Sequence, residues 1–304
     1  MSPLDPAILD TLAFSGLDET EMQRRAVLSR EGIDLFKHEM SYVRRRIIMN
    51  STELPGLIVL PDGPATLESY DAFIEELSDR FNIAILEVPG FGFSYALSPD
   101  ALEFDATCHI LSAAIDDLKL RQAVVVGACV QGLIAARIVE INPTLLSGLI
   151  IAQTADFENE IEWANKAIDT HGNLARPFEG QIGFRLARER ATVDWWTPLV
   201  AGPKLQLQEF QAEARKVLRC GCSFALASQI QKCNTTTPPP VLCPSIPTTV
   251  IWGNADVSHT HTDKRSILHC VPGAEYIERD DLGHFPDLED PELIARVAKK
   301  LLRD

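Results

Sequence analysis

Cys129 is the residue of this sequence best placed to do chemistry. It follows the apolar, β-branched residues 124–126 and precedes the helical pattern of residues 133–139. This order predicts a strand, a sharp turn and a helix, with the thiol at the apex of the turn. Backbone N–H groups at the start of a helix favour the thiolate, which is the reactive form of cysteine. The sequence therefore predicts a nucleophilic cysteine whose thiolate is stabilised by the helix.

A cysteine nucleophile needs a base, and His284 is the best candidate. It lies within residues 280–286, in a loop that follows the last predicted strand. An imidazole beside the nucleophile can accept its proton and is itself oriented by a carboxylate. His259 and His261 follow the loop that contains Asp256, and they could line the same pocket.

The elements that would hold these residues alternate between strands and helices. Short apolar runs predict buried strands, and residues 291–302, near the end of the chain, carry a helical pattern. Such alternation indicates an α/β fold with a mostly parallel sheet covered by helices on both faces. Ligands bind at the carboxyl ends of the strands in folds of this kind. The predicted strands are residues 57–60, 83–88, 124–126, 149–152, 248–252 and 274–278, and the closing helix is residues 291–302.

The alternation is interrupted once, by a helical and strand-poor stretch. We therefore expect a core formed by residues 1–156, which begins with a helical lead-in, and by residues 241–304, with a helical cap of residues 157–240 between them. Residues 235–240 are rich in threonine and proline and predict a stiff, extended connector. Trp195 and Trp196 of the cap are expected to line a substrate pocket.

Composition limits the partners of the chain. The 304 residues carry a net charge of −15, which disfavours binding to nucleic acid, and 46% of them are hydrophobic, enough for a large core. We find neither an apolar run long enough to span a bilayer nor the pattern of a signal peptide, so we expect a cytoplasmic protein with no membrane partner. The one basic cluster, residues 44–46, is interpreted as a solvated strand edge.

Cysteine usage points to free thiols rather than to a disulfide scaffold or a metal site. The chain has seven cysteines, an odd number. Cys220 and Cys222, with Cys233 and Cys243, lack the paired spacing of a zinc site, so we expect no metal. No organic cofactor is implied either.

Four motifs together resemble the α/β-hydrolase family across residues 40–304. Along the chain they are residues 88–94, the turn at Cys129, residues 252–256 and residues 283–285, and this is the order found in the family. The resemblance implies a nucleophile, an acid and a histidine in that order along the chain: Cys129, Asp256 and His284. Some members carry the acid after an earlier strand, where Asp156 stands, and Asp156 therefore remains the alternative.

The loop after the first long strand departs from the family pattern. The family usually has His-Gly-X there, and residue X donates a backbone N–H to the oxyanion of the reaction. Here the loop reads Asp62-Gly63-Pro64, and proline has no N–H. Loss of one such donor typically costs about 3 kcal/mol. We expect the Val130 N–H to be one donor, and either a shifted loop makes the Ala65 N–H the second or the enzyme tolerates a weaker oxyanion hole.

Two further departures concern the turn itself. The family usually has serine as the nucleophile, where this chain has Cys129, and glycine two residues later, where it has Gln131. The Gln131 amide could point into the pocket. The turn with a cysteine at its apex resembles the corresponding turn of two groups with this fold. One is the dienelactone hydrolases, which open unsaturated lactones, and the other is the Dieckmann-type cyclases, which release an acyl chain from a carrier protein by ring closure.

Three functions follow from these residues. The first is hydrolysis of an ester or thioester of a hydrophobic small molecule through a thioester on Cys129. The second is Dieckmann-type cyclisation in natural-product biosynthesis, in which the acyl substrate is bound to a carrier and a carbanion attacks the thioester. The third is a non-catalytic protein on a hydrolase scaffold, which binds or folds its substrate.

Overall fold

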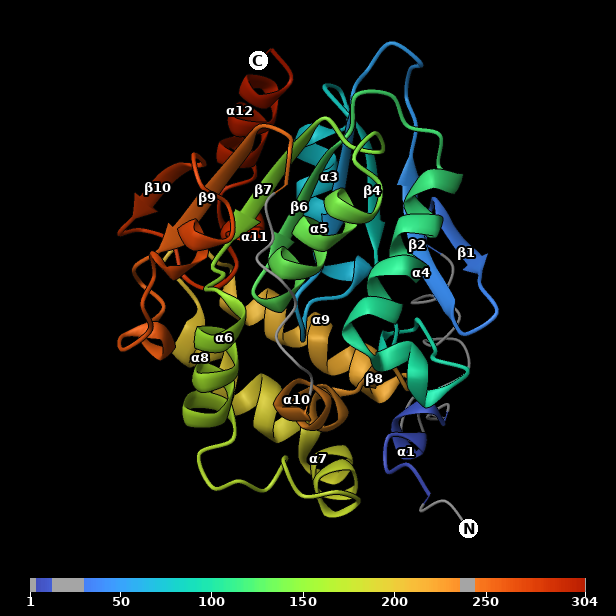
Figure 1. Cartoon of the computed structure of the whole chain (residues 1–304), viewed down its shortest axis with the longest axis vertical. Helices are drawn as coiled ribbons and strands as arrows, with labels where there is room; N and C mark the ends of the chain where they lie inside the picture. The colour runs from blue at the N-terminus through green and yellow to red at the C-terminus, as the bar shows by residue number, and fades with distance from the viewer. Residues whose placement is uncertain (1–3, 13–29, 236–243, 304) are drawn as a thin grey trace.

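An eight-stranded sheet runs through the molecule in the computed structural model (Figure 1). The structure describes residues 4–12, 30–235 and 244–303. The first two strands of the sheet pair in antiparallel fashion with their neighbours, and the remaining six are parallel. This confirms the predicted mostly parallel α/β sheet. In spatial order the strands are β1 (Ile33–Lys37), β2 (Tyr42–Ile48), β4 (Asn82–Leu86), β3 (Gly56–Leu60), β6 (Val124–Ala128), β7 (Gly148–Ala152), β9 (Thr248–Gly253) and β10 (Glu275–Arg279).

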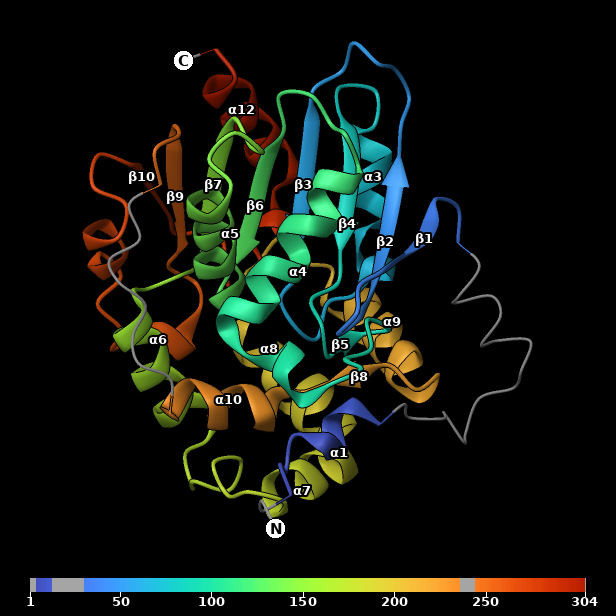
Figure 2. The same ribbon diagram turned by 45° about the vertical axis from the view of Figure 1, so that its right-hand side comes forward.

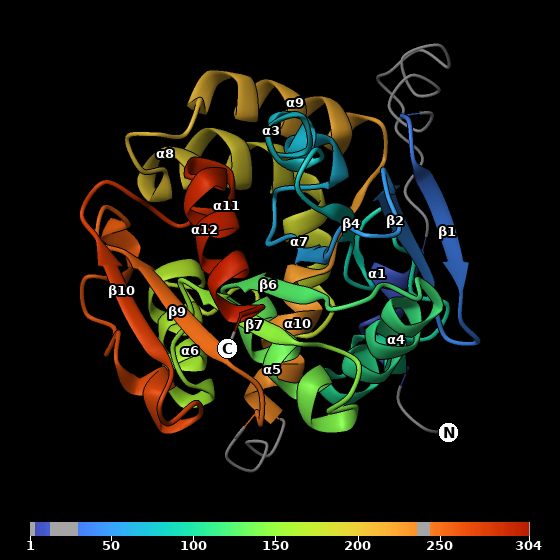
Figure 3. The same cartoon turned by 90° about the horizontal axis from the view of Figure 1, so that it is seen from above.

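Helices cover both faces of the sheet because its central strands are apolar on both sides. On β3, Ile58 and Leu60 join the core formed with one pair of helices, and Leu57 and Val59 join the core on the opposite face. Figure 3 shows the two layers on either side of the strands. The first layer contains α4 (Phe104–Asp117) and α5 (Val130–Ile141), and the second contains α3 (Asp71–Leu77) and α12 (Pro291–Leu301).

The cap is inserted between β7 and β9 and lies beyond the ends at which the parallel strands finish (Figure 2). A two-stranded ribbon of β5 (Phe91–Gly92) and β8 (Ser223–Phe224) joins it to a loop of the core. The helices of the cap are α6 (Phe157–Trp163), η3 (Ala164–Ile168), α7 (Glu179–Arg188), η4 (Glu189–Trp196), α8 (Thr197–Val200), α9 (Leu207–Arg219) and α10 (Leu226–Thr235).

Short helices complete the described part of the chain. From the expected helical lead-in, the structure describes α1 (Ile8–Thr11), and residues 13–29 lie outside the described ranges. Most of the expected connector and Cys243 also lie outside them. None of the helices in the described ranges combines the length and apolar character of a bilayer span. The remaining elements are η1 (Leu67–Tyr70), η2 (Pro99–Leu102), η5 (Val257–His259), η6 (Ser266–His269) and α11 (Pro286–Glu289).

The interpretation of residues 44–46 as a solvated strand edge is wrong. They lie on β2, an inner strand, and all three arginines are buried. Arg44 is 1% exposed and pairs with Glu68 at 2.5 Å and with Glu87 at 3.3 Å. Burial of these charges is tolerated because carboxylates from distant parts of the chain meet them.

Candidate active site

Cys129 lies at a sharp turn between β6 and α5, where the sequence predicted it. Its φ of 54° and ψ of −137° are unusual for a residue with a side chain, and such strain concentrates at functional sites. The turn leaves no room at its flanks, since a Cβ on Gly127 would lie 2.3 Å from the Gln131 carbonyl oxygen. Backbone bonds hold the cysteine, because its N–H donates to Ala152 and its carbonyl accepts from the Thr154 hydroxyl.

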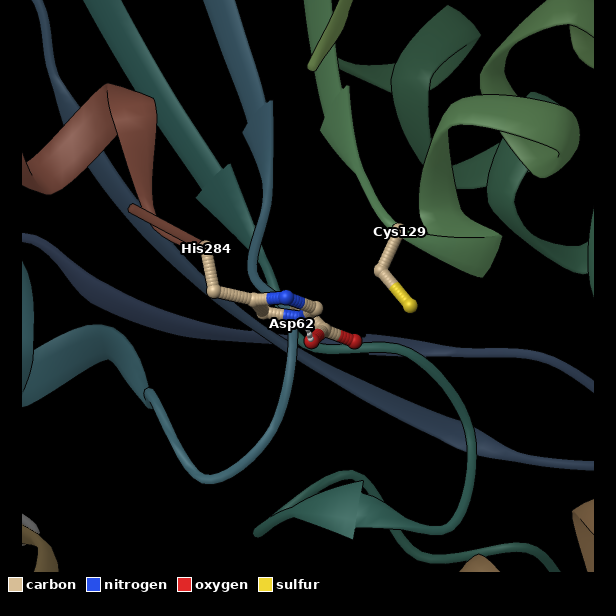
Figure 4. A group of neighbouring side chains, drawn as sticks. All are labelled: Asp62, Cys129 and His284. Atoms are coloured by element: carbon tan, nitrogen blue, oxygen red, sulfur yellow. Dashed lines mark hydrogen bonds and ion pairs between the residues drawn. The ribbon is translucent and has the colours of Figure 1, made fainter. Parts of the chain in front are cut away.

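His284 and Asp256 reach the same place from the loops after β10 and β9. The His284 Nδ1 lies 2.6 Å from the Asp256 Oδ2, and both side chains are buried. A nitrogen of His284, the Cys129 Sγ and a carboxylate oxygen of Asp62 all lie within 4.8 Å of one another (Figure 4). The structure therefore brings together the thiol, imidazole and carboxylate of the expected triad, with Asp256 as the acid.

Charges around the imidazole favour its protonated form. Burial alone would lower the pKa of His284, but the carboxylates of Asp256 and Asp62 outweigh it and raise this pKa well above its usual value. Burial alone would likewise raise the pKa of Asp256, but His284 and His259 hold it below its usual range. The pair is therefore a carboxylate bound to an imidazolium at neutral pH.

Asp62 is a site residue that the sequence analysis missed. Its Oδ2 lies 3.2 Å from the His284 Nε2, the nitrogen that a catalytic base directs at its nucleophile. The Gln131 amide donates to the other oxygen, Oδ1, at 2.9 Å. Gln131 is fully buried and does not point into the pocket as expected. The loop had been analysed only for oxyanion donors, and the signal available was the acidic residue at the family's histidine position.

Glu160 is the second residue that sequence reasoning missed. It lies on α6, at the start of the cap, and its Oε2 is 3.8 Å from the Cys129 Sγ. Its Oε1 accepts the Ala155 N–H at 2.6 Å. Burial raises the pKa of Glu160 to about 8, although the Ala155 N–H and His284 oppose the rise. At pH 7 its carboxyl group is therefore mostly protonated.

The surroundings of Cys129 favour the neutral thiol, not the thiolate that the helix was expected to stabilise. Burial raises the pKa of Cys129 well above its usual value, and the carboxyl groups of Asp62 and Glu160 raise it further. His284 opposes this rise. Cys129 is therefore a neutral thiol at rest, and a role as nucleophile would require it to lose its proton.

Asp156, the alternative acid, serves another purpose. Its carboxylate caps α6 by accepting from the Asn159 backbone N–H at 2.9 Å. Its Oδ2 lies 3.9 Å from the exposed His269. The structure does not bring Asp156 to His284.

His259 also contacts the acid instead of lining the pocket. Its Nδ1 lies 2.8 Å from the Asp256 Oδ2, and its ring stacks on Trp163 at 4.2 Å between centroids. Asp256 is thus held by two imidazoles, and the cap contacts the second one.

The site opens into a cavity of about 530 Å³ between the core and the cap. The polar wall residues nearest Cys129 are Asp62, Glu160 and His284. Of the expected substrate-binding residues, the wall includes Gly63, Val130, Trp195 and Trp196, whereas Pro64, Ala65 and Gln131 lie outside it. Aromatic side chains form much of the wall: Phe91, Phe157, Trp163, Phe184, Trp195, Trp196 and Phe224.

The second oxyanion donor that was expected at Ala65 is engaged elsewhere. The Ala65 N–H donates to the Asp62 carbonyl at 3.0 Å, within the turn of its own loop. The Val130 N–H lies at the first position of α5, directly after the nucleophile. Of the two backbone donors expected from the sequence, the structure therefore leaves one available, the Val130 N–H.

Potential metal ligands coincide with this site. Donor atoms of Asp62, Cys129 and His284 lie within 4.8 Å of one another, as do those of Asp256, His259 and His284. Both groups are already joined by hydrogen bonds, which account for their proximity. Cys220 and Cys222 are buried.

Comparison with known proteins gives one family match and many similar folds. A family model described as alpha/beta hydrolase fold matches residues 55–291. No curated protein sequence matches the chain. The three similar solved structures described next share less than 20% identity with the chain, so they show a common fold.

The three structures illustrate the range of activities on the fold. An epoxide hydrolase of Bacillus megaterium, solved with an inhibitor, has a TM-score of 0.70 and 16% identity, over 89% of this chain and 100% of that chain. An enol-lactonase of Burkholderia xenovorans has a TM-score of 0.66 and 19% identity, over 89% and 100%. A thermophilic esterase of Thermogutta terrifontis has a TM-score of 0.66 and 19% identity, over 89% and 98%.

Proposed function

Because this chain belongs to the α/β-hydrolase fold family, we propose that it is an acyl-transfer enzyme that hydrolyses an ester or thioester of a hydrophobic small molecule. The observation that carries the proposal is the meeting of Cys129 and His284 on the wall of one cavity, with Asp256 bound to His284 behind them. The aromatic wall supports an apolar acyl group as the substrate.

The proposed reaction begins when the site loses one proton, because the resting thiol and imidazolium are both protonated. Neutral His284 then accepts the Cys129 proton through Nε2 while Sγ attacks the acyl carbon. The carbonyl oxygen carries the negative charge of the tetrahedral intermediate. His284 returns the proton to the leaving alcohol or thiol, and a thioester remains on Cys129. Water, deprotonated by His284, attacks the thioester, the C–S bond breaks to release the acid, and His284 returns the proton to the Cys129 sulfur.

Asp256 supports this cycle by its position. Its bond to the His284 Nδ1 fixes the tautomer that presents Nε2 to the nucleophile, and its charge stabilises the imidazolium. Asp62 must release Nε2 for the proton transfer, since it occupies that nitrogen in the resting site.

Intact-mass spectrometry with S-phenyl thiooctanoate tests the proposal. We expect the wild type to gain one octanoyl group and to release octanoic acid. Cys129→Ala should give neither, whereas Cys233→Ala, which changes another thiol of the same cavity, should behave as the wild type. Release of octanoic acid by Cys129→Ala at the wild-type rate would contradict a covalent thioester. Binding of the probe without reaction in both proteins would favour the non-catalytic alternative.

Asp62 favours a second candidate function, Dieckmann-type cyclisation. Its carboxylate lies beside both the nucleophile and the base, so it is placed to take a proton from an acidic carbon of the bound acyl chain. The carbanion would attack the acyl carbon, the C–S bond would break, and the proton that Asp62 took would pass through His284 to the Cys129 sulfur. The acyl substrate could arrive free or on a carrier protein.

Product mass separates the two functions. We would use an S-phenyl thioester whose chain carries a β-dicarbonyl carbon spaced to close a six-membered ring. Hydrolysis yields an acid, and cyclisation yields a product lighter by one water. Cyclisation should also fail in Asp62→Asn, and a cyclic product formed equally well by this variant would contradict the role of Asp62.

A further inference from the structure

We propose that Glu160 donates a hydrogen bond from its carboxylic acid to the carbonyl oxygen of the acyl group under attack by Cys129. Glu160 would then supply the second oxyanion donor that the loop after β3 does not provide. This inference rests on the proposed acyl transfer and adds a catalytic residue from the cap side of the cavity.

The site needs such a donor because the backbone leaves one position unfilled. Pro64 has no N–H, and the Ala65 N–H donates to the Asp62 carbonyl. The Gln131 amide, which could have replaced them, donates to the Asp62 carboxylate. The Val130 N–H alone would leave the developing negative charge with one backbone donor.

Glu160 is fixed in the orientation that this role requires. The Ala155 N–H binds Oε1 at 2.6 Å, so Oε1 acts as the acceptor and the acid proton belongs on Oε2. Oε2 is the oxygen that accepts from the Cys129 thiol at 3.8 Å, and it is released to donate once His284 has taken the thiol proton. A carbonyl group whose carbon is bonded to that sulfur places its oxygen within hydrogen-bond reach of Oε2.

The surroundings of Glu160 keep it protonated at neutral pH. Burial raises its pKa to about 8, Asp62 raises it further, and His284 and the Cys129 thiol oppose the rise. Cys233 on α10 also lies near Glu160, and a negative charge on Glu160 would raise the pKa of the Cys233 thiol. A buried carboxyl group that stays neutral can donate a hydrogen bond, whereas its carboxylate would repel the oxyanion.

The step balances without any added reactant. The Sγ–C bond forms, the π electrons of the carbonyl group move to its oxygen, and the Glu160 O–H stabilises that oxygen. When the intermediate collapses, the C=O bond re-forms, the bond to the leaving group breaks, and the acid proton remains on Glu160.

Three variants test this role with S-phenyl thiooctanoate. Glu160→Gln keeps an acceptor for Ala155 and presents an N–H to the pocket, so we expect acylation within roughly ten-fold of the wild type. Glu160→Leu removes the donor and should acylate roughly 100- to 1000-fold more slowly. Glu162→Gln, on the exposed side of the same helix, is the matched control and should not change the rate.

The pH dependence and a second reaction separate donation from a structural role. The ratio of the wild-type acylation rate to the rate of Glu160→Gln should fall as the pH rises through about 8, because only the wild type loses its donor by deprotonation. Alkylation of Cys129 by iodoacetamide creates no oxyanion, so Glu160→Leu should alkylate at least as fast as the wild type.

Distinct results overturn distinct claims. Acylation of Glu160→Leu at the wild-type rate, or equal losses in Glu160→Leu and Glu160→Gln, would overturn the donor role while the thioester on Cys129 still forms. Equal losses of acylation and alkylation in Glu160→Leu would show a structural defect and would also overturn it. A wild type that forms no adduct on Cys129 would overturn the proposed function itself.

Discussion

Replacing Asp62 with asparagine should make Cys129 more reactive at neutral pH. Asp62 holds a negative charge against both the imidazolium of His284 and the thiol of Cys129, and this charge raises the pKa of each group. Asparagine keeps the size of the side chain and an acceptor for the Gln131 amide, but it removes the charge. Without that charge the site should lose its first proton at a lower pH, so the reactive form should be more abundant at pH 7.

The separation of Asp62 and His284 gives the size of the effect. At 3.2 Å, and with an effective dielectric constant of about 20, the attraction between the two charges is about 5 kcal/mol. One pKa unit corresponds to about 1.4 kcal/mol, so the upper limit of the shift is about 3 to 4 pH units. Water in the cavity will screen part of this attraction, and we expect a downward shift of at least about one unit.

The assay is the rate of Cys129 alkylation by iodoacetamide as a function of pH. The acidic limb of this profile should move to lower pH in Asp62→Asn, and the rate at pH 7 should rise about ten-fold or more. Asp116→Asn, at an exposed position on α4, should leave the profile unchanged. An acidic limb that stays in place or moves upward in Asp62→Asn would refute the claim that Asp62 keeps the site protonated.

Three further substitutions test the site and the buried ion pair. Asp256→Ala should reduce turnover of the thioester probe by roughly 10⁴-fold, because His284 loses the partner that fixes its tautomer. Asp156→Ala should keep turnover within a few-fold. It should lower the free energy of unfolding in urea by about 1 kcal/mol, because a helix cap is lost. Equal kinetic losses would assign both carboxylates to the site. Arg44→Met should lower the free energy of unfolding in urea by about 3 to 5 kcal/mol, because two buried glutamates lose their partner; a loss below about 1 kcal/mol would contradict the importance of that ion pair.

The strands and the turn that holds Cys129 could be predicted because their signals are local. A run such as residues 124–126 is apolar on both faces, which requires burial between two layers of helices. The small residues after it permit a tight turn, and they placed Cys129 correctly at its apex. His284 was found by the same reasoning, since it follows the last strand of a parallel sheet.

The misjudged residues depend on partners that are distant in sequence. Arg44 can be buried because Glu68 and Glu87 pair with it, and the residues adjacent to Arg44 in the sequence give no sign of these two partners. Glu160 occupies an ordinary position on a polar helix and becomes part of the site only because the cap folds over Cys129. Asp62 did carry a local signal, its place in a loop where the family has histidine, but that loop was analysed for backbone donors alone.

The missed carboxyl groups change the picture of how the nucleophile is activated. Asp62, Glu160 and Asp256 converge on one imidazole and one thiol in a mainly apolar cavity. Burial penalises several negative charges at close range, so the site retains protons: on the imidazole, on Glu160 and on the thiol. A preformed thiolate would add one more anion to this group. Activation of Cys129 must therefore accompany substrate binding, when the acyl group displaces water and its carbonyl oxygen provides a place for the negative charge.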